Sequence, residues 1–170
     1  MDKELLTIIS PIKDAMAFLE AHMNRLMSIS SELGIKLLII DNNSHDSELN
    51  YVRQLAVNFS HLNIKYEKNL QDLGVHGSLQ KALKMVTTPY VTYVAADDVI
   101  FKDYIVRALN VLEADESISL VWGQGYMVEL LTGGSPLKRV NPFSNLGEGK
   151  ITGNSIRALL SNYPVDTGLV

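Results

Sequence analysis

Short apolar segments alternate with longer amphipathic segments along roughly the first 115 residues, and this alternation constrains the fold more than any other feature. LLTIIS (Leu5–Ser10) and IKLLII (Ile35–Ile40) have the length and composition of buried strands. Between them, Asp14–Ser30 carries apolar residues at helical spacing, and Gly34 follows as a helix-terminating glycine. This succession of strand and helix predicts an α/β fold, with a mostly parallel sheet and helices on both of its faces.

The same patterns predict a full order of elements. The strands are expected at 5–10, 35–40, 63–68 and 88–95, and the helices at 14–30, 47–60, 75–86 and 102–113. The third strand alternates polar and apolar residues, which is typical of a sheet edge. After Ser117, a strand pair around Gly133 and Gly134 is expected, then a polar loop and a short helix at 154–161. Residues 1–170 are expected to form one domain.

Composition excludes several classes of protein. The chain has 170 residues, 46% of them hydrophobic, which suffices for one domain with a substantial core. Its net charge is −4 and its basic residues are scattered, so no nucleic-acid partner is expected. Without cysteine, disulfides, thiolate zinc sites and cysteine nucleophiles are excluded. No apolar run approaches the roughly 20 residues of a membrane span, and Leu5–Ile9 is too short for a signal peptide, so a cytoplasmic protein is expected.

Polar residues collect where the predicted strands end. In a sheet of this kind ligands bind outside the carboxyl ends of the strands, so these residues form one candidate rim. They are Pro11, Lys13 and Asp14 after the first strand, Asp41, Asn42, Asn43 and Ser44 after the second, Asn69, Asp72 and Gly74 after the third, and Asp97 and Asp98 after the fourth. Each also has an ordinary explanation as a turn or capping residue, and Ser44 or Asp46 would cap the next helix.

The adjacent carboxylates of Asp97 and Asp98 are the least ordinary feature of this rim. Two carboxylates at a strand end raise each other's pKa unless a cation lies beside them, and a divalent metal is the simplest such cation. No glycine-rich phosphate-binding motif follows the first strand, where SPIKDA stands instead. A diphosphate would then bind through Mg²⁺ or Mn²⁺, which favours a nucleotide-linked substrate.

The four histidines are too dispersed in the sequence to match a metal-binding spacing. His22 lies on a predicted helix and is expected at a surface or boundary position. His76 follows Gly74 and is a weaker candidate for a contact to phosphate.

Four motifs, in order, resemble those of the family 2 glycosyltransferases of GT-A fold. IISPIKD resembles I-I-P-x-x-N, LLIIDNNSHD resembles V-V-D-x-x-S-x-D, NLQDLG resembles the N-x-G turn, and YVAADD resembles F-L-D-x-D-D. The resemblance covers about residues 4–135 and includes the expected strand pair. It implies a Rossmann-like GT-A fold and inverting, metal-assisted transfer of a sugar from a nucleotide diphosphate sugar to a glycan or lipid-linked acceptor.

The resemblance also implies a role for each matching residue. Pro11 would lie at the nucleotide, Asp41 would accept a hydrogen bond from the base, and Asp72 would help to shape the turn near the ribose. Asp97 would coordinate the Mn²⁺ or Mg²⁺ that bridges the diphosphate, and Asp98 would support the metal or the sugar. The implied donor-binding set is Pro11, Lys13, Asp14, Asp41, Asn43, Asp72, Gly74, Ala96, Asp97 and Asp98.

Several positions depart from the family pattern. Asp14 and Asp72 each replace a usual Asn, and Ala95 stands where the first Asp of the D-x-D motif often lies. Leu79–Gln80 stands where the family often has Arg-Asn. These changes put expected contacts to the ribose, metal or diphosphate in doubt, and Lys13 could supply positive charge instead, although it has an equally good explanation as a solvated side chain.

The end of the sequence differs from the family as well. The general base of this family follows the metal motif at a distance, and no matching element precedes Val170; Asp166 does not fit the motif. The resemblance therefore indicates a C-terminally truncated domain, with a nucleotide-binding half at about 1–115 and an incomplete acceptor-side region at 116–170.

Two functions of different classes stay open. One is a glycosyltransferase of surface polysaccharide or glycoconjugate synthesis, associated with a membrane only through its acceptor. The other is a non-catalytic remnant that binds a nucleotide sugar or a protein partner, and self-association through apolar surface is a further alternative. A phosphoryl-receiver domain is disfavoured because the acidic pair follows the fourth strand rather than the first. A nucleotidyltransferase is disfavoured because SPIKDA is not a glycine-rich, arginine-bearing loop.

Overall fold

The structure is a computed structural model that describes residues 4–123, 125–128 and 136–140. The chain divides into two compact units, residues 1–102 and 103–170, and each is described by itself. The first unit contains the elements β1 (Leu6–Ile12), α1 (Met16–Leu33), β2 (Lys36–Asp41), α2 (Asp46–Asn58), β3 (Ile64–Lys68), α3 (Gly74–Leu83) and β4 (Tyr90–Tyr93). The helix α4 (Lys102–Ala114) begins at the boundary between the units.

The sheet of the first unit has the strand order β3-β2-β1-β4, and every neighbouring pair is parallel. The expected parallel α/β fold is confirmed, and so is the position of β3 at an edge of the sheet. The order reverses between β1 and β4, because the chain adds β2 and β3 on one side and β4 on the other. Such a reversal opens a crevice at the carboxyl ends of the two strands, which is where ligands bind in folds of this kind.

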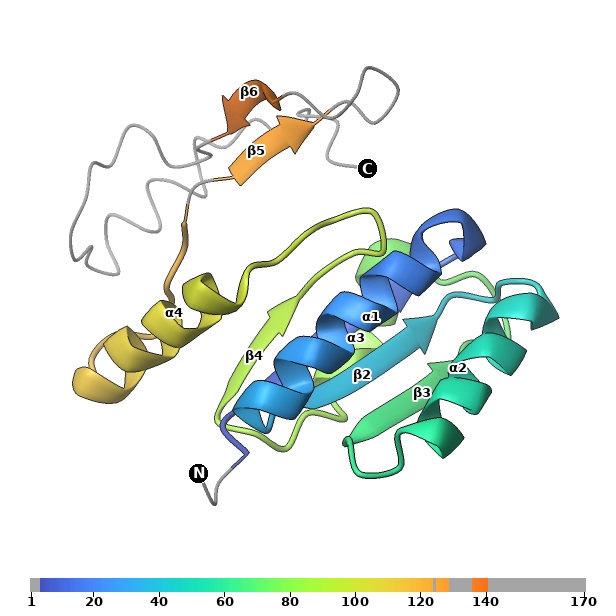
Figure 1. Ribbon diagram of the computed structural model, residues 1–170, viewed down its shortest axis with the longest axis horizontal. Helices are drawn as coiled ribbons and strands as arrows, with labels where there is room; N and C mark the ends of the chain where they lie inside the picture. The colour runs from blue at the N-terminus through green and yellow to red at the C-terminus, as the bar shows by residue number, and fades with distance from the viewer. Residues whose placement is uncertain (1–3, 124, 129–135, 141–170) are drawn as a thin grey trace. The chain divides into compact units, whose positions relative to one another are not determined.

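Helices cover both faces of this sheet, with α1 and α2 on one face and α3 on the other (Figure 1). Ile9, Leu38 and Ile40 form the core on the α3 side, where they pack with Ala82. Ile8, Leu37 and Ile39 alternate with them along β1 and β2, so they point to the opposite face. Both strands are buried almost without interruption, as expected for a parallel sheet covered on both sides.

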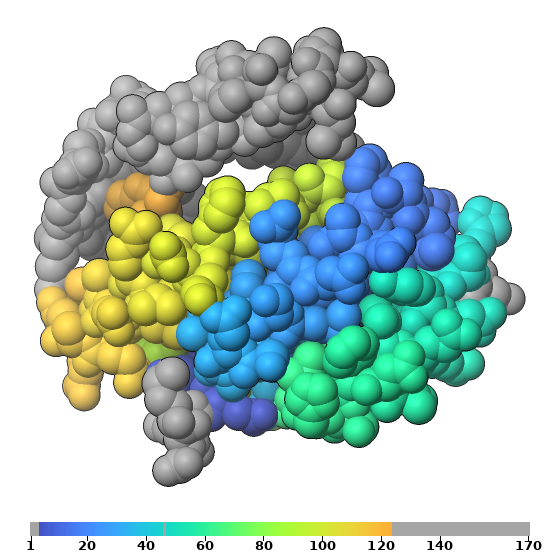
Figure 2. All heavy atoms as spheres, viewed as in Figure 1, coloured from blue at the N-terminus to red at the C-terminus, as the bar shows by residue number. Residues whose placement is uncertain are grey.

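Helix α1 ends as the sequence predicts. Gly34 has a φ of 64° and its N–H donates to the Ser30 carbonyl oxygen over 2.8 Å, which closes the last turn of the helix. Figure 2 gives the same view with all atoms as spheres, and the side chains of α1 and α2 cover the sheet on this face. Helix α1 connects the carboxyl end of β1 to the start of β2, so it runs back along the sheet, away from the carboxyl ends of the strands.

The second unit contains α4 and an antiparallel pair, β5 (Gly125–Val128) and β6 (Pro136–Val140). The expected strand pair is confirmed in these two strands, whereas residues 118–123 form no strand, contrary to the expectation. In that stretch the Val121 carbonyl oxygen accepts a hydrogen bond from the Tyr104 hydroxyl instead of a strand neighbour. The turn at Gly133 and Gly134 and the helix expected at 154–161 lie outside the described residues.

A search of the described residues for a helix that is both long enough and apolar enough to span a bilayer finds none.

Candidate functional site

Most of the predicted site residues meet at the carboxyl edge of the four-stranded sheet. The loops after β1, β2, β3 and β4 all emerge there, because the strands are parallel. Ile12 lies opposite Asp41 in the register, so β1 and β2 end at the same level. Pro11 lies within β1, opposite Ile40, rather than in the loop that follows the strand.

Asp41, the last residue of β2, is completely buried and uses both carboxylate oxygens. Oδ1 accepts the Ser44 N–H over 2.7 Å, and Oδ2 accepts a short hydrogen bond from the Tyr66 hydroxyl. Burial, together with the bond to Asp41, raises the pKa of Tyr66 well above its usual range, so the phenol keeps its proton. No sequence motif singles out Tyr66. Tyr66 lies two residues before Lys68, and Lys68 pairs with Asp41 in the register. Side chains two residues apart on a strand share a face, so Tyr66 and Asp41 lie on the same face of the sheet.

Asn42 connects the end of β2 to the loop after β3. Its side-chain oxygen accepts the Leu73 N–H over 2.8 Å and an amide hydrogen of Asn69 over 3.2 Å, while its amide donates to Asp72. Asn69 also donates to the Ser78 hydroxyl over 2.9 Å. Asn42, Asn69 and Ser78 are all buried, and no buried side-chain polar atom in the described part of the chain lacks a hydrogen-bond partner. The loop at 69–73 is thus fixed before any ligand arrives.

Lys13 and Asp72 form an ion pair at the surface of this rim. The Lys13 ammonium group, the Gly74 N–H and the Asn42 amide together lower the pKa of Asp72 to about 2. The side chains of Lys13 and Asp72 are about half exposed, 47% and 50%, so solvent screens the pair. Lys13 is therefore bonded within the rim, and its charge is matched by Asp72.

The loops after β1 and β2 are tied to each other by three residues. The Ser44 hydroxyl accepts the Asp14 N–H over 3.0 Å, and the Asp14 carboxylate lies 2.9 Å from His45 Nδ1. The bond to His45 is the main reason that the pKa of Asp14 is lowered. Asp14 and Asn43 have φ values of 46° and 66°, a left-handed conformation that Asp and Asn adopt more readily than most residues.

The expectation that Ser44 or Asp46 caps the next helix is wrong. The N-cap residue of α2 is His45, and no side-chain hydrogen bond caps the helix there. The Ser44 hydroxyl accepts the Asp14 N–H, and the Ser44 N–H donates to Asp41, so Ser44 is part of the rim.

Asp97 and Asp98 lie on a tight turn after β4, at the reversal of strand order. The Asp98 N–H donates to the Ala95 carbonyl oxygen over 3.0 Å, and Ala96 lies within this turn. Both aspartates are exposed, yet nearby protein atoms partly desolvate the Asp98 carboxyl and raise its pKa, and the charge of Asp97 raises it further. A cation beside the pair would relieve both effects.

The donor set fits a hard divalent cation that is shared with a ligand. Carboxylate oxygens are the ligands that Mg²⁺ and Mn²⁺ prefer. Among residues 4–123, 125–128 and 136–140, no group of three or more His, Cys, Asp or Glu side chains is arranged to hold a metal ion. Asp97 and Asp98 alone would supply only part of a coordination shell, and diphosphate and water oxygens would have to supply the rest.

His22 is buried, with 4% of its surface exposed, so the expected surface or boundary position is wrong. Its Nε2 lies 2.7 Å from the Ser10 hydroxyl oxygen of β1. Burial lowers the pKa of His22, although the nearby backbone of Asp98 and the charge of Asp97 oppose this effect. The ring points inward because α1 packs this side against β1 and the loop after β4.

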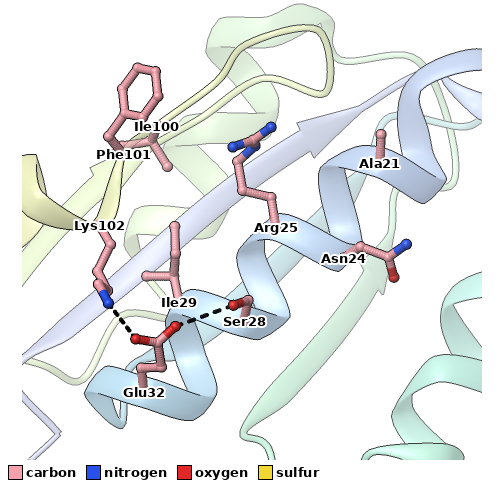
Figure 3. Close-up of a pocket in the computed structure, with 9 residues that line it drawn as sticks. All are labelled: Ala21, Asn24, Arg25, Ser28, Ile29, Glu32, Ile100, Phe101 and Lys102. Carbon is pink, nitrogen blue, oxygen red and sulfur yellow. Dashed lines mark hydrogen bonds and ion pairs between the residues drawn. The ribbon is translucent and has the colours of Figure 1, made fainter.

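A groove of about 410 Å³ runs between α1 and residues 100–102 (Figure 3). Arg25 and Phe101 line it, and Glu32 accepts hydrogen bonds from Lys102 and Ser28 at one end. Because α1 returns from the carboxyl edge, most of the groove lies along the helix and away from the rim. None of the predicted site residues lines it.

Comparison with known proteins agrees with this arrangement. The model of the family described as "Glycosyl transferase family 2" matches residues 7–158, so the chain belongs to glycosyl transferase family 2. Comparison of the sequence with curated proteins finds no match.

Several solved structures are similar in fold to about two thirds of this chain. The mannosyltransferase PcManGT from Pyrobaculum calidifontis, in complex with GDP-Man and Mn²⁺, is 20% identical over 68% of this chain and 34% of its own, with a TM-score of 0.61. TarS from S. aureus is 21% identical over 65% of this chain and 32% of its own, with a TM-score of 0.55. A structure of S. aureus TarS in complex with UDP is 23% identical over the same shares, also with a TM-score of 0.55. The chain spans about a third of the length of these proteins, and the likeness confirms the GT-A fold.

Proposed function

We propose that the chain binds a nucleoside diphosphate sugar at the carboxyl edge of its sheet and takes part in transfer of the sugar to an acceptor hydroxyl. The observation that carries this proposal is the Asp97–Asp98 pair, which follows β4 at the reversal of strand order, where partial desolvation and the charge of Asp97 raise the pKa of Asp98. Membership of glycosyl transferase family 2 supports it, and so do the UDP and GDP-Man complexes of proteins with the same fold.

The nucleoside would occupy the part of the rim beside β1 and β2. Pro11, Asp14 and Asn43 line the ends of these strands, and the loop that holds Asp72 and Gly74 is fixed beside them by Asn42. We assign Asp41 to the floor of this pocket. Each carboxylate oxygen can accept a second hydrogen bond, but Asp41 is completely buried, so a base N–H would reach it only after the residues that cover it move.

The diphosphate would lie toward β4, where Asp97 and Asp98 would hold the metal ion. When bound, Mn²⁺ or Mg²⁺ neutralises charge on the departing diphosphate. In the transfer step, the acceptor oxygen forms a bond to the anomeric carbon while the bond from that carbon to the diphosphate oxygen breaks. The electron pair stays with the diphosphate, and the acceptor proton goes to a general base that we do not assign to any described residue.

An assay of sugar-nucleotide turnover tests the proposal. UDP-glucose, UDP-N-acetylglucosamine and GDP-mannose are incubated with the chain and Mn²⁺, and release of UDP or GDP is measured with and without glycan acceptors. We expect the wild-type chain to release UDP or GDP only when the metal is present. Asp97→Ala should abolish this release, and Glu20→Gln should retain it. Glu20 is a matched control because it is an exposed carboxylate on α1 outside the rim. Binding of the nucleotides without any turnover would favour the non-catalytic alternative, and absence of both would overturn the proposal.

The biological setting is proposed on the family resemblance alone. We place the transfer in surface polysaccharide or glycoconjugate synthesis, on the cytoplasmic side and with a glycan or lipid-linked acceptor.

A further inference from the structure

Lys13 and Asp72 belong to loops on opposite sides of β2. The strand order β3-β2-β1-β4 places β2 between β1 and β3, and Lys13 follows β1 whereas Asp72 follows β3. Their ion pair therefore crosses the carboxyl end of β2, where the buried carboxylate of Asp41 lies. Asn42, the residue after Asp41, donates to Asp72, so Asp72 also contacts the end of β2 itself. The pair thus spans the strand end at which the proposed function places the nucleobase.

The two carboxylate oxygens of Asp72 have separate roles. Oδ1 accepts the Gly74 N–H over 2.8 Å and a hydrogen of the Asn42 amide, and these bonds fix the loop after β3. Oδ2 accepts from the Lys13 ammonium group and so connects this loop to the loop after β1. Loss of the Lys13 contact would leave the bonds at Oδ1 in place. The loop that holds Asp72 can therefore stay fixed while the ion pair opens.

Opening of the pair requires the movement of a single side chain. Lys13 and Asp72 are both about half exposed, so solvent screens their attraction, and exposed side chains change rotamer within nanoseconds. Lys13 carries the only permanent positive charge among the predicted donor-binding residues, which include five aspartates. An incoming diphosphate therefore competes with Asp72 for this ammonium group.

The loop that carries Lys13 borders both parts of the proposed donor site. Because β1 lies between β2 and β4, the loop after β1 separates the end of β2 from the Asp97–Asp98 turn after β4. The proposed function places the nucleobase at the end of β2 and the diphosphate at the turn. A Lys13 side chain that leaves Asp72 is thus placed to meet the diphosphate.

We propose that the Lys13–Asp72 pair closes the nucleoside part of the site in the absence of a donor, and that the donor opens it by drawing the Lys13 ammonium group from Asp72 to the diphosphate. The statement about the donor rests on the proposed function, whereas the closure of the strand end does not. The pair thereby favours nucleoside diphosphates over free nucleosides, because only a phosphate group replaces the lost partner of Lys13.

Two substitutions open the pair in different ways. Asp72→Asn keeps the Oδ1 acceptor that fixes the loop and replaces Oδ2 by an amide group, which cannot accept from Lys13. Lys13→Met keeps most of the length of the side chain and removes its charge. Glu32→Gln and Lys102→Met are the matched controls, because Glu32 and Lys102 form an ion pair of similar exposure away from the rim.

The first measurement needs no ligand. The Ser44 N–H donates to the buried carboxylate of Asp41, so its hydrogen exchange reports how often water reaches the end of β2. Asp72→Asn and Lys13→Met should each speed this exchange by about two- to fivefold, the factor that corresponds to an exposed ion pair. The two control variants should leave it unchanged.

The second measurement compares neutral nucleosides with diphosphates. Uridine and guanosine are titrated alone, and UDP and GDP are titrated with Mg²⁺, each followed by NMR. Asp72→Asn and Lys13→Met should both bind the preferred nucleoside about two- to fivefold more tightly than the wild type, because no ion pair has to open. With the diphosphate, Asp72→Asn should gain affinity by a similar factor, whereas Lys13→Met should lose about threefold or more because the phosphate lacks its ammonium partner.

Unchanged exchange at Ser44 in both Asp72→Asn and Lys13→Met would overturn the proposal. Weaker binding of the nucleoside by Asp72→Asn would overturn it as well, and so would equal losses of diphosphate affinity in the two variants. If the wild-type protein binds none of the four compounds, the proposed function fails. The exchange at Ser44 then still decides whether the pair closes the end of β2.

Discussion

Replacement of Asn42 by alanine should destabilise the first unit and loosen the loop at 69–73. The side chain is buried and makes hydrogen bonds to Asp72, Asn69 and the Leu73 N–H. The substitution leaves the Leu73 N–H and the Asn69 amide without this partner, whereas the exposed Asp72 can turn to water. At roughly 1–1.5 kcal/mol for each of the bonds to Asn69 and Leu73 and less for the bond to Asp72, the expected loss is about 2–4 kcal/mol.

The loss is measurable by urea unfolding followed by circular dichroism. With a urea dependence of about 1–3 kcal/mol per molar, the midpoint should fall by roughly 1–2 M. Asn42→Asp keeps the acceptor oxygens for Leu73 and Asn69 but places a second carboxylate beside Asp72, so it should fall between wild type and Asn42→Ala at neutral pH. Asn50→Ala, an exposed change on α2, serves as the surface control. An Asn42→Ala midpoint equal to that of Asn50→Ala would refute the hub role of Asn42.

Three further predictions concern residues whose local environment is well defined. The pKa of Asp72 is lowered to about 2, so its carboxylate stabilises the folded state above the unfolded pKa of about 4, and this contribution is lost as the pH falls toward 2. Lys13→Met should raise the pKa of Asp72 in an NMR titration and reduce the pH dependence of stability over this range. An unchanged pKa of Asp72 in this variant would contradict the ion pair. Tyr66→Phe removes a donor from the buried carboxylate of Asp41 and should cost roughly 1.5–3 kcal/mol in urea unfolding, whereas a neutral effect would mean that Asp41 does not depend on this bond. Gly34→Ala forces a side chain into a φ of 64° and should cost about 1–2 kcal/mol, with no effect on nucleotide binding because the helix end lies away from the rim; full stability of the variant would exclude the left-handed cap.

Much of the fold could be predicted because it depends on local patterns. The apolar runs that became β1 and β2 are buried on both faces, and their short length and β-branched content suffice to identify them. The alternation of strand and helix predicts parallel strands, and the loops that follow parallel strands lie at one edge of the sheet. The sequence alone therefore predicts that the Asp97–Asp98 pair lies on the rim.

The hydrogen bonds within the rim could not be predicted, because they join residues far apart in the sequence. Ser44 looks like a helix cap in its own segment, and only the approach of the β1 loop gives its hydroxyl the Asp14 N–H as a partner. His22 looks like a polar residue on a helix surface, and only the packing of α1 against β1 shows that it faces Ser10. Tyr66 bonds Asp41 across neighbouring strands, and the register that brings them together is not a local property.

The central claim is that Asp97 and Asp98 bind a divalent metal together with a nucleoside diphosphate. Calorimetry tests this claim most directly. UDP and GDP are titrated, with and without Mn²⁺, into the wild-type protein, Asp97→Ala and the Glu20→Gln control. The account predicts that one nucleotide binds much more tightly with Mn²⁺, that Asp97→Ala abolishes this gain, and that Glu20→Gln retains it. Binding that is indifferent to both the metal and the Asp97 substitution would contradict it.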